Sequence, residues 1–270
     1  MDKNNLVWWG AGCESGNNIW NWGDQLSPWL YSKISGVPID KINRVGLRDQ
    51  TSTPRHYVVG SLLNMIYSPN AEIWGSGLET SKIKSHALPS KLHAVRGPLT
   101  RTALIAAGCD CPEVYGDPAL LLPKYYTPNV KKEYKYGIVQ HFSHKQETAW
   151  ISKYKNDPTV NIIDIQNPSI TGFIDEINKC EIILSSALHG IICGDAYGIP
   201  SYHINFSSNG SFNWFKFYDY YASVGRPLTK PPLLLNKNID IKDLWPPLYN
   251  YSINIDLDKL LKACPFSHKN

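Results

Sequence analysis

A strand that ends in two serines, followed by a histidine and a glycine, is the feature of this chain best suited to chemistry. The apolar segment 182–184 precedes Ser185 and Ser186, and His189 and Gly190 then lead into a helix. In an open α/β sheet, ligands bind at the carboxyl ends of strands, where backbone N–H groups and the helix dipole favour anions. The pattern predicts a binding loop for a phosphorylated or carboxylated small molecule.

His189 precedes the helix that we expect over 191–197, and we interpret it as a ligand-facing residue. Imidazole has an unperturbed pKa of about 6.5, so the side chain can act as an acid or as an anion ligand. The alternative is a loop histidine that caps a backbone carbonyl.

Arg96 ends a second expected strand and precedes Gly97-Pro98, where a helix begins. A guanidinium group binds a carboxylate or a phosphate through two parallel hydrogen bonds, which suits the same class of ligand. The alternative is a salt bridge between two lobes. Gly77, in a Gly-Ser-Gly turn, would let the backbone approach a ligand closely.

Asn21 and Asp24 open an amphipathic helix that we expect to reach about Ser35. Asp24 is either a base that activates a sugar hydroxyl or an ordinary first-turn residue that stabilises the helix dipole. Lys216 lies within an aromatic cluster over 215–221. Its ammonium group either reaches an anion across a cleft or extends along the aromatic surface into water.

Two series of alternating strands and helices must position these residues, and such alternation indicates parallel sheets with covering helices. The segment 123–133 has two prolines and no periodicity, so it is an expected linker. We therefore predict an α/β protein with a lobe over 1–125 and a second lobe over 126–270. We expect the last helix, 257–263, to pack back on the first lobe.

Composition restricts the class of protein. The chain has 270 residues, of which 43% are hydrophobic and 19% charged, as in a globular protein. A net charge of +4 without long basic runs argues against nucleic-acid binding. No signal peptide and no stretch near the ~20 apolar residues of a membrane span are evident. The six cysteines lack zinc-site spacing, so we expect reduced thiols and a cytoplasmic protein.

Several cofactor patterns are absent from the sequence. We find no glycine-rich dinucleotide fingerprint, no phosphate-binding loop of the Walker type and no zinc-protease motif. Asp164, Asp175 and Asp195 each lack a second acidic residue at the Asp-x-Asp spacing of a glycosyltransferase metal site. We therefore predict no cofactor and no obligatory metal.

Six short motifs occur in a characteristic order over residues 6–226. They are Asn21-x-Gly23-Asp24, Gly75-Ser76-Gly77, the Val-Arg-Gly-Pro-Leu-Thr segment 95–100, Gly116-Asp117-Pro118-Ala119, Ser185-Ser186-x-x-His189-Gly190 and Ala196-Tyr197-Gly198-Ile199-Pro200. In these motifs the chain resembles the polysaccharide pyruvyltransferase family, and most of all its bacterial exopolysaccharide and capsule members.

The resemblance implies a GT-B-like fold, in which two Rossmann-like lobes face a central cleft. It implies transfer of a pyruvyl group from phosphoenolpyruvate to two sugar hydroxyls, with formation of a cyclic ketal and release of phosphate. Motif position implies that Arg96 and His189 belong to the phosphoenolpyruvate site, and Lys216 matches the lysine of that site by its aromatic context alone. Arg96 would lie in an acceptor-side first lobe and His189 in a donor-side second lobe.

The resemblance also implies the partners. We expect a saccharide acceptor carried on a lipid at the cytoplasmic leaflet. The mildly positive chain would then contact the inner face of an anionic membrane peripherally.

The chemistry of phosphoenolpyruvate agrees with these residue types. Its carboxylate and phosphate need cations, which Arg96 and Lys216 would supply, while His189 would be the acid and Asp24 the base. A nucleotide-sugar-dependent GT-B glycosyltransferase is one alternative. A noncatalytic saccharide-binding protein of a polysaccharide assembly complex is another.

Overall fold

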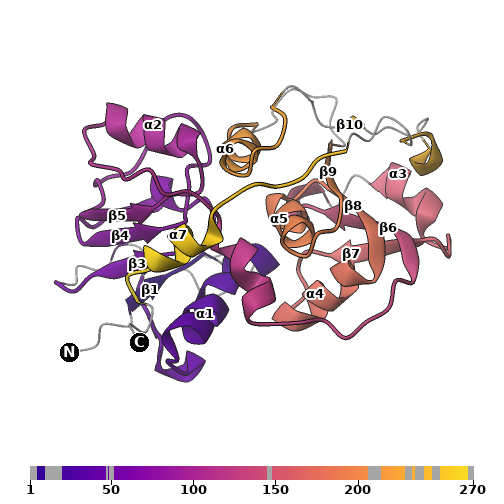
Figure 1. Ribbon diagram of the computed structural model, residues 1–270, viewed down its shortest axis with the longest axis horizontal. Helices are drawn as coiled ribbons and strands as arrows, with labels where there is room; N and C mark the ends of the chain where they lie inside the picture. Colours follow the sequence, from indigo (N-terminus) through magenta and orange to yellow (C-terminus); the bar gives the residue numbers. More distant parts are fainter. Residues whose placement is uncertain are drawn as a thin grey trace.

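Two sheets of parallel strands form the framework of the protein (Figure 1). The computed structural model describes residues 5–9, 20–46, 48, 52–144, 148–205, 214–228, 233–234, 240–244 and 250–266. The first sheet has the order β2-β1-β3-β4-β5. Its strands are β1 (Asn5–Val7), β2 (Asn43–Arg44), β3 (Arg55–Tyr57), β4 (Ala71–Trp74) and β5 (Lys91–Ala94).

The second sheet has the order β10-β9-β8-β6-β7, and its strand pairs are also parallel. Its strands are β6 (Tyr134–Gln140), β7 (Val160–Asp164), β8 (Cys180–Ser185), β9 (Ser201–Asn205) and β10 (Leu233–Leu234). β8 lies at the centre with Ile183 and Leu184 fully buried, which is why the sequence shows it as a continuous apolar run. The predicted α/β class with two parallel sheets is confirmed.

Helices connect and cover the strands of both sheets. The α-helices are α1 (Trp22–Ser35), α2 (Pro98–Ala106), α3 (Thr148–Ile151), α4 (Ile170–Asn178), α5 (Leu188–Ala196), α6 (Phe215–Ser223) and α7 (Leu257–Lys262). Short 3-10 helices are η1 (Ile39–Lys41), η2 (Leu63–Met65), η3 (Pro118–Lys124), η4 (Phe142–His144), η5 (Ser152–Tyr154) and η6 (Ile241–Leu244). Within the described residues, no helix has the length and apolar character needed to cross a bilayer.

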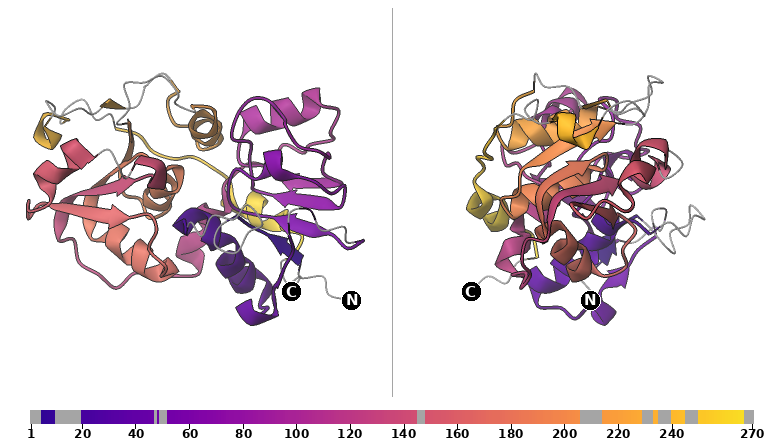
Figure 2. Two further views of the ribbon diagram at one scale, coloured as in Figure 1. Left: turned by 180° about the vertical axis from the view of Figure 1, so that it is seen from behind. Right: turned by 90° about the vertical axis from the view of Figure 1, so that its right-hand side faces the viewer.

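We call β1–β5 with α1 and α2 the first lobe, and β6–β10 with α3–α5 the second lobe. Viewed from behind, the lobes lie side by side, and α6 lies between them (Figure 2). The last helix, α7, packs near the first sheet, where the Trp74 indole donates to the Leu260 carbonyl at 2.8 Å.

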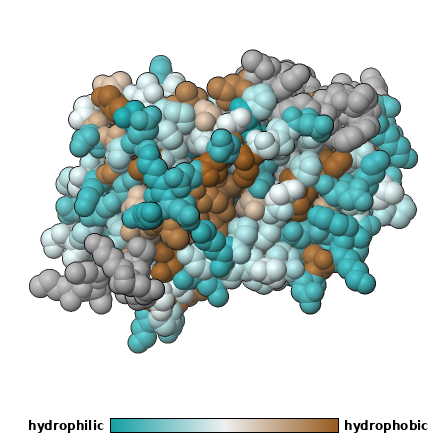
Figure 3. Space-filling view, viewed as in Figure 1, coloured by the Kyte–Doolittle hydropathy of each residue, from teal (hydrophilic) through white to brown (hydrophobic). Residues whose placement is uncertain are grey.

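One hydrophobic core cluster continues from lobe to lobe. Trp22, at the start of α1, stacks on Phe173 of α4 with ring centroids 4.4 Å apart. Its backbone N–H also donates to the Ile165 carbonyl of the second lobe at 2.9 Å. On the surface, apolar residues gather along the junction between the lobes (Figure 3). The lobes are therefore joined by packed side chains as well as by the chain connections.

Two helices differ from the sequence prediction. α5 begins at Leu188 and not at Ile191, so His189 lies in its first turn. Its N-cap residue, Ala187, makes no side-chain capping bond, so the sequence contains no capping residue that marks where this helix begins. α6 was not predicted at all, because only an aromatic cluster was evident there.

Candidate active site

A pocket of about 200 Å³ opens between the lobes, at the carboxyl ends of strands from both sheets. This is where parallel α/β sheets bind their ligands. The lining residues from the first lobe are Trp9, Asn21, Asp24, Ser61, Leu62, Met65 and Glu79. Those from the second lobe are His141, Phe142, Ile165, Ala187, Leu188 and His189, and α6 contributes Lys216.

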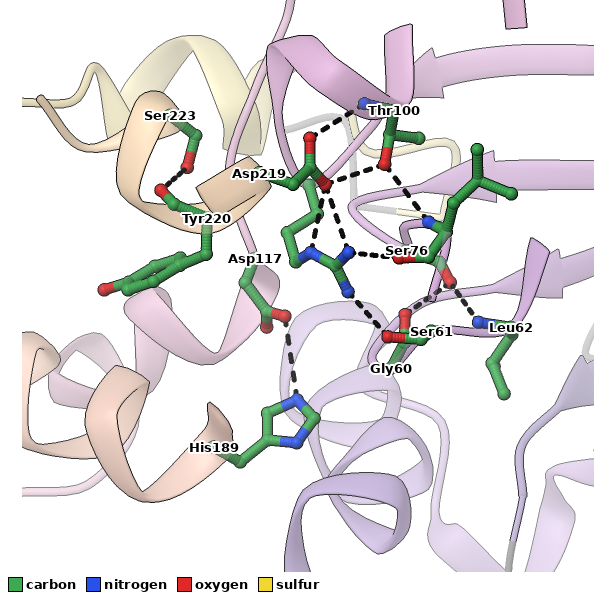
Figure 4. Close-up of polar contacts among 12 residues, drawn as sticks. Gly60, Ser61, Leu62, Ser76, Thr100, Asp117, His189, Asp219, Tyr220 and Ser223 are labelled. Atoms are coloured by element: carbon green, nitrogen blue, oxygen red, sulfur yellow. Dashed lines mark hydrogen bonds and ion pairs between the residues drawn. The ribbon is translucent and has the colours of Figure 1, made fainter. Parts of the chain in front are cut away.

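His189 faces a buried carboxylate at the edge of the pocket (Figure 4). Its Nε2 lies 3.6 Å from Oδ2 of Asp117, whose side chain is fully buried. The other oxygen, Oδ1, accepts a hydrogen bond from the Ala119 N–H at 3.0 Å and so holds the carboxylate in place. Neither Nε2 nor Oδ2 has a hydrogen-bond partner among the described residues. A small shift of either side chain would form a charge-assisted hydrogen bond.

The position of the His189 ring explains the glycine of the Asn-x-Gly-Asp motif. A Cβ on Gly23 would overlap the ring, so α1 approaches α5 this closely only with glycine at that position. Asn21 is the N-cap of α1, and its side chain accepts from the Gly23 N–H at 3.0 Å. The motif therefore builds a helix start against which the histidine packs.

Asp24 follows on α1 and lines the same pocket. Burial raises the pKa of its carboxyl from 3.8 to about 6, against the opposing effects of the positive charges on His189 and Lys216. The nearby carboxylates of Glu79 and Asp117 raise this pKa further. A carboxyl with a pKa near neutrality can exchange protons with a substrate hydroxyl.

Lys216 enters the pocket from the first turn of α6. Its Nζ lies 3.3 Å from Oε1 of Glu79, and the two side chains are 18% and 47% exposed. Because the Glu79 side chain is the more exposed of the two, an anion in the pocket could replace it as the partner of the ammonium group.

Arg96 lies behind the pocket wall, fully buried, and does not line the pocket. Its Nε donates to Oδ2 of Asp219 at 3.1 Å, Nη1 donates to Oγ of Ser61 at 2.8 Å, and Nη2 donates to the Leu78 carbonyl. A Cβ on Gly77 would overlap this guanidinium group. Arg96 therefore forms a buried ion pair with α6, the helix that lies between the lobes. Direct anion binding by Arg96 stays a prediction.

The two serines and the glycine of the His189 loop contact other protein groups, within the loop or at the end of β6. Oγ of Ser185 accepts from the Ala187 N–H at 3.1 Å, and a Cβ on Gly190 would overlap that oxygen. Oγ of Ser186 accepts from the His141 N–H at 2.9 Å. These contacts fix the turn from β8 into α5, and ligand binding by the three residues stays a prediction.

Sequence reasoning missed an aromatic wall of the pocket. The rings of Trp9 and Phe142 are nearly parallel, at 19°, with centroids 6.5 Å apart, although they come from different lobes. The His141 ring lies 4.3 Å from that of Phe142. These residues follow β1 and β6 directly, so the rule that ligands bind at carboxyl ends of strands could have identified them.

His141 is electrically neutral in this wall. Burial lowers the pKa of its imidazole to about 3, and the positive charges of Lys216, His144 and His189 lower this pKa further. Nδ1 lies 2.7 Å from Oγ of Ser143 and 3.3 Å from the Ser143 backbone nitrogen, so Ser143 holds the orientation of the ring. A neutral imidazole beside aromatic faces suits an uncharged, hydroxylated ligand better than an anion.

Metal binding is not evident in the part of the chain that the structure describes. No group of three His, Cys, Asp or Glu side chains there is arranged to hold a metal ion. The predicted lack of a cofactor and of an obligatory metal remains untested.

Comparisons with known proteins identify the family of the chain. An uncharacterised protein of Acanthamoeba polyphaga mimivirus is 29% identical over 252 residues, which cover 90% of this chain and 84% of the viral protein. The succinoglycan biosynthesis protein ExoV of Rhizobium meliloti (strain 1021) is 28% identical over 214 residues, or 76% of this chain and 62% of ExoV. The family model for polysaccharide pyruvyl transferase matches residues 40–208. The chain therefore belongs to the polysaccharide pyruvyl transferase family.

Proposed function

We propose that this protein transfers the pyruvyl group of phosphoenolpyruvate to two hydroxyls of a saccharide, forming a cyclic ketal and releasing phosphate. Family membership supports polysaccharide pyruvylation in general. The observation that carries the specific proposal is the placement of His189, backed by Asp117, in one pocket with Asp24 and Lys216.

The two acceptor hydroxyls supply both protons that the proposed reaction needs. The two hydroxyl oxygens form bonds to the central carbon of phosphoenolpyruvate, and the bond from that carbon to the phosphate oxygen breaks. One proton ends on the methylene carbon, which becomes a methyl group, and the other leaves on the phosphate. The site must therefore protonate carbon and deprotonate hydroxyls within one turnover.

The donor binds through its negative charges at Lys216 and at the start of α5. Ala187 and Leu188 line the pocket there, and the first N–H groups of a helix have no partner within the helix. Together with the helix dipole they favour a phosphate or a carboxylate. When the donor binds, Lys216 exchanges Glu79 for the donor anion.

His189 supplies the proton to the donor, so its ring must be protonated before the transfer. Asp117 stabilises this imidazolium form. Asp24 takes a proton from an acceptor hydroxyl, for which its pKa of about 6 is suitable. Both residues are reached from the same 200 Å³ space, so donor and acceptor meet there.

The saccharide acceptor lies against Trp9 and Phe142, with His141 as a hydrogen-bond partner. The C–H face of a pyranose ring packs on aromatic rings, and a neutral imidazole bonds to hydroxyls without attracting the anionic donor. We extend the proposal to a lipid-linked acceptor at the cytoplasmic face of a membrane and to a GT-B-like relation of the lobes. The net charge of +4 supports peripheral attraction to anionic lipid.

Proton NMR tests this function directly. The chain is incubated with phosphoenolpyruvate and either lipid-linked saccharides or methyl pyranosides, and the methylene signals of the donor are followed together with phosphate release. We expect the methylene signals to be replaced by a methyl singlet on the saccharide. His189→Ala should lower turnover by about 10²–10⁴-fold, whereas His93→Ala, outside the pocket, should not. Consumption of a UDP- or GDP-sugar in place of phosphoenolpyruvate would contradict the proposal and favour a glycosyltransferase.

A further inference from the structure

Asp219 ties α6 to the first lobe through a fully buried cluster (Figure 4). Its carboxylate accepts from Nε of Arg96 at 3.1 Å, from the Thr100 N–H at 2.8 Å and from the Thr100 hydroxyl at 2.7 Å. Gly97 allows this approach, since a Cβ there would overlap the Asp219 carbonyl oxygen. The carboxylate thus occupies the N-terminus of α2, although it belongs to a helix that follows the second lobe in the chain.

The same cluster contacts the pocket wall at Ser61 and holds Leu78, the residue that precedes Glu79. Arg96 donates to Ser61, which lines the pocket, and to the Leu78 carbonyl. The Leu78 N–H donates to Oγ1 of Thr100 at 3.1 Å, so both backbone polar groups of Leu78 are fixed next to Glu79. On α6, Asp219 lies three residues after Lys216, which places both on neighbouring positions of one helix face. The cluster therefore fixes the backbone segments that carry both partners of the Lys216–Glu79 ion pair.

The other side of α6 is attached to the helix that carries His189. The hydroxyl of Tyr220 donates to Oδ2 of Asp195 on α5 at 2.7 Å, and Arg226 donates to the same oxygen at 2.8 Å. α6 is therefore connected through buried carboxylates to both lobes. Its orientation sets where the Lys216 ammonium group lies relative to His189.

We infer that Arg96 and Asp219 are positioning residues, which hold Lys216 in the pocket from behind its wall and do not themselves contact the donor. This inference rests on the proposed function only for the identity of the donor. It explains why an arginine with all three guanidinium nitrogens bonded to protein lies so near an anion site. It also assigns a role to Asp219, which lies in none of the six motifs, and to Thr100, the last residue of the Val-Arg-Gly-Pro-Leu-Thr motif.

A double-mutant cycle on phosphoenolpyruvate affinity tests the inference. Lys216→Met should weaken binding on the order of 10–100-fold, and Asp219→Asn should weaken it by about tenfold. In the Lys216→Met background, Asp219→Asn should have no further effect, because its effect passes through the lysine. Equal losses in both backgrounds, or wild-type affinity in Asp219→Asn, would overturn the inference. If Asp219→Asn does not fold, Thr100→Val removes one bond of the same cluster and takes its place.

A second readout needs no donor and separates this inference from the proposed function. Lysines are given isotope-labelled dimethyl groups, and the NMR signal absent from Lys216→Met is assigned to Lys216. That signal should shift in Asp219→Asn and stay in place in Asp258→Asn, which breaks only an exposed ion pair with Lys124. An unmoved signal would overturn the positioning role even if phosphoenolpyruvate binds. A shifted signal in a chain that does not bind phosphoenolpyruvate would sustain the positioning role and contradict the proposed donor.

Discussion

His189 and Asp117 come from opposite sides of the lobe junction, and their side chains meet with Nε2 and Oδ2 3.6 Å apart. The histidine lies in the first turn of α5, and the aspartate is the N-cap of η3. A buried carboxylate beside an imidazole stabilises the imidazolium ion and fixes the orientation of the ring. The pair therefore has the arrangement of a proton donor with its orienting group.

Asp117→Asn should lower kcat by about 10–100-fold, the usual effect of losing an orienting partner. The affinity for phosphoenolpyruvate should stay near that of the wild type, because Asp117 does not line the pocket. Steady-state kinetics and calorimetry on the same preparation separate the two effects. A variant that loses affinity and keeps its kcat would show that Asp117 serves donor binding.

Asp24→Asn should lower kcat and at the same time stabilise the fold at neutral pH. Burial raises the pKa of this carboxyl from 3.8 to about 6, so between these values the native state binds a proton that the unfolded state releases. The wild-type free energy of unfolding should therefore fall as pH rises through this window, by up to about 3 kcal/mol.

Urea unfolding between pH 3.5 and 8 measures this dependence. The Asn variant should lack the decrease between about pH 4 and 6, whereas the exposed control Asp40→Asn should keep it. A variant with the same pH profile as the wild type would show that Asp24 titrates normally in the folded protein.

Gly23→Ala should reduce activity nearly as much as loss of His189, because the new Cβ would overlap the His189 ring. Alanine has a higher helix propensity than glycine by about 1 kcal/mol, so α1 itself should not be weakened. Turnover measured beside circular dichroism distinguishes these effects. Full activity in a folded variant would mean that the ring position is unimportant.

The alternation of apolar strands and helices made both parallel sheets predictable, because strand and helix periods are local properties of the sequence. α6 was not predictable in this way. Its N-cap, Trp214, makes no side-chain capping bond, and its position depends on Asp219 reaching the distant α2. Contacts between segments this far apart in the chain leave no local pattern.

Part of the pocket lining could also be predicted from the sequence. Asn21, Asp24, His189 and Lys216 were predicted as site residues, and all four line the pocket. Arg96, Gly77, Ser185, Ser186 and Gly190 were also predicted, and they are not among the residues that line the pocket. Residue type predicted an anion-binding arginine, but only the fold shows that its guanidinium group is already paired with Asp219.

Trp9→Ala should weaken saccharide binding by about five- to tenfold, through loss of one ring of the aromatic wall. Saturation-transfer NMR with methyl pyranosides measures this binding. Tyr67→Ala, which removes a ring stacked on His86 outside the pocket, is the matched control. Donor affinity should be unchanged in both variants. Equal saccharide signals from wild type and Trp9→Ala would place the acceptor elsewhere.

Calorimetric titration of phosphoenolpyruvate into the wild type, Lys216→Met and the exposed control Lys155→Met tests the central claim most directly. The account predicts saturable binding by the wild type and Lys155→Met, and a loss on the order of 10–100-fold in Lys216→Met. No saturable binding to the wild type, or equal affinity in all three proteins, would contradict a phosphoenolpyruvate site at this pocket.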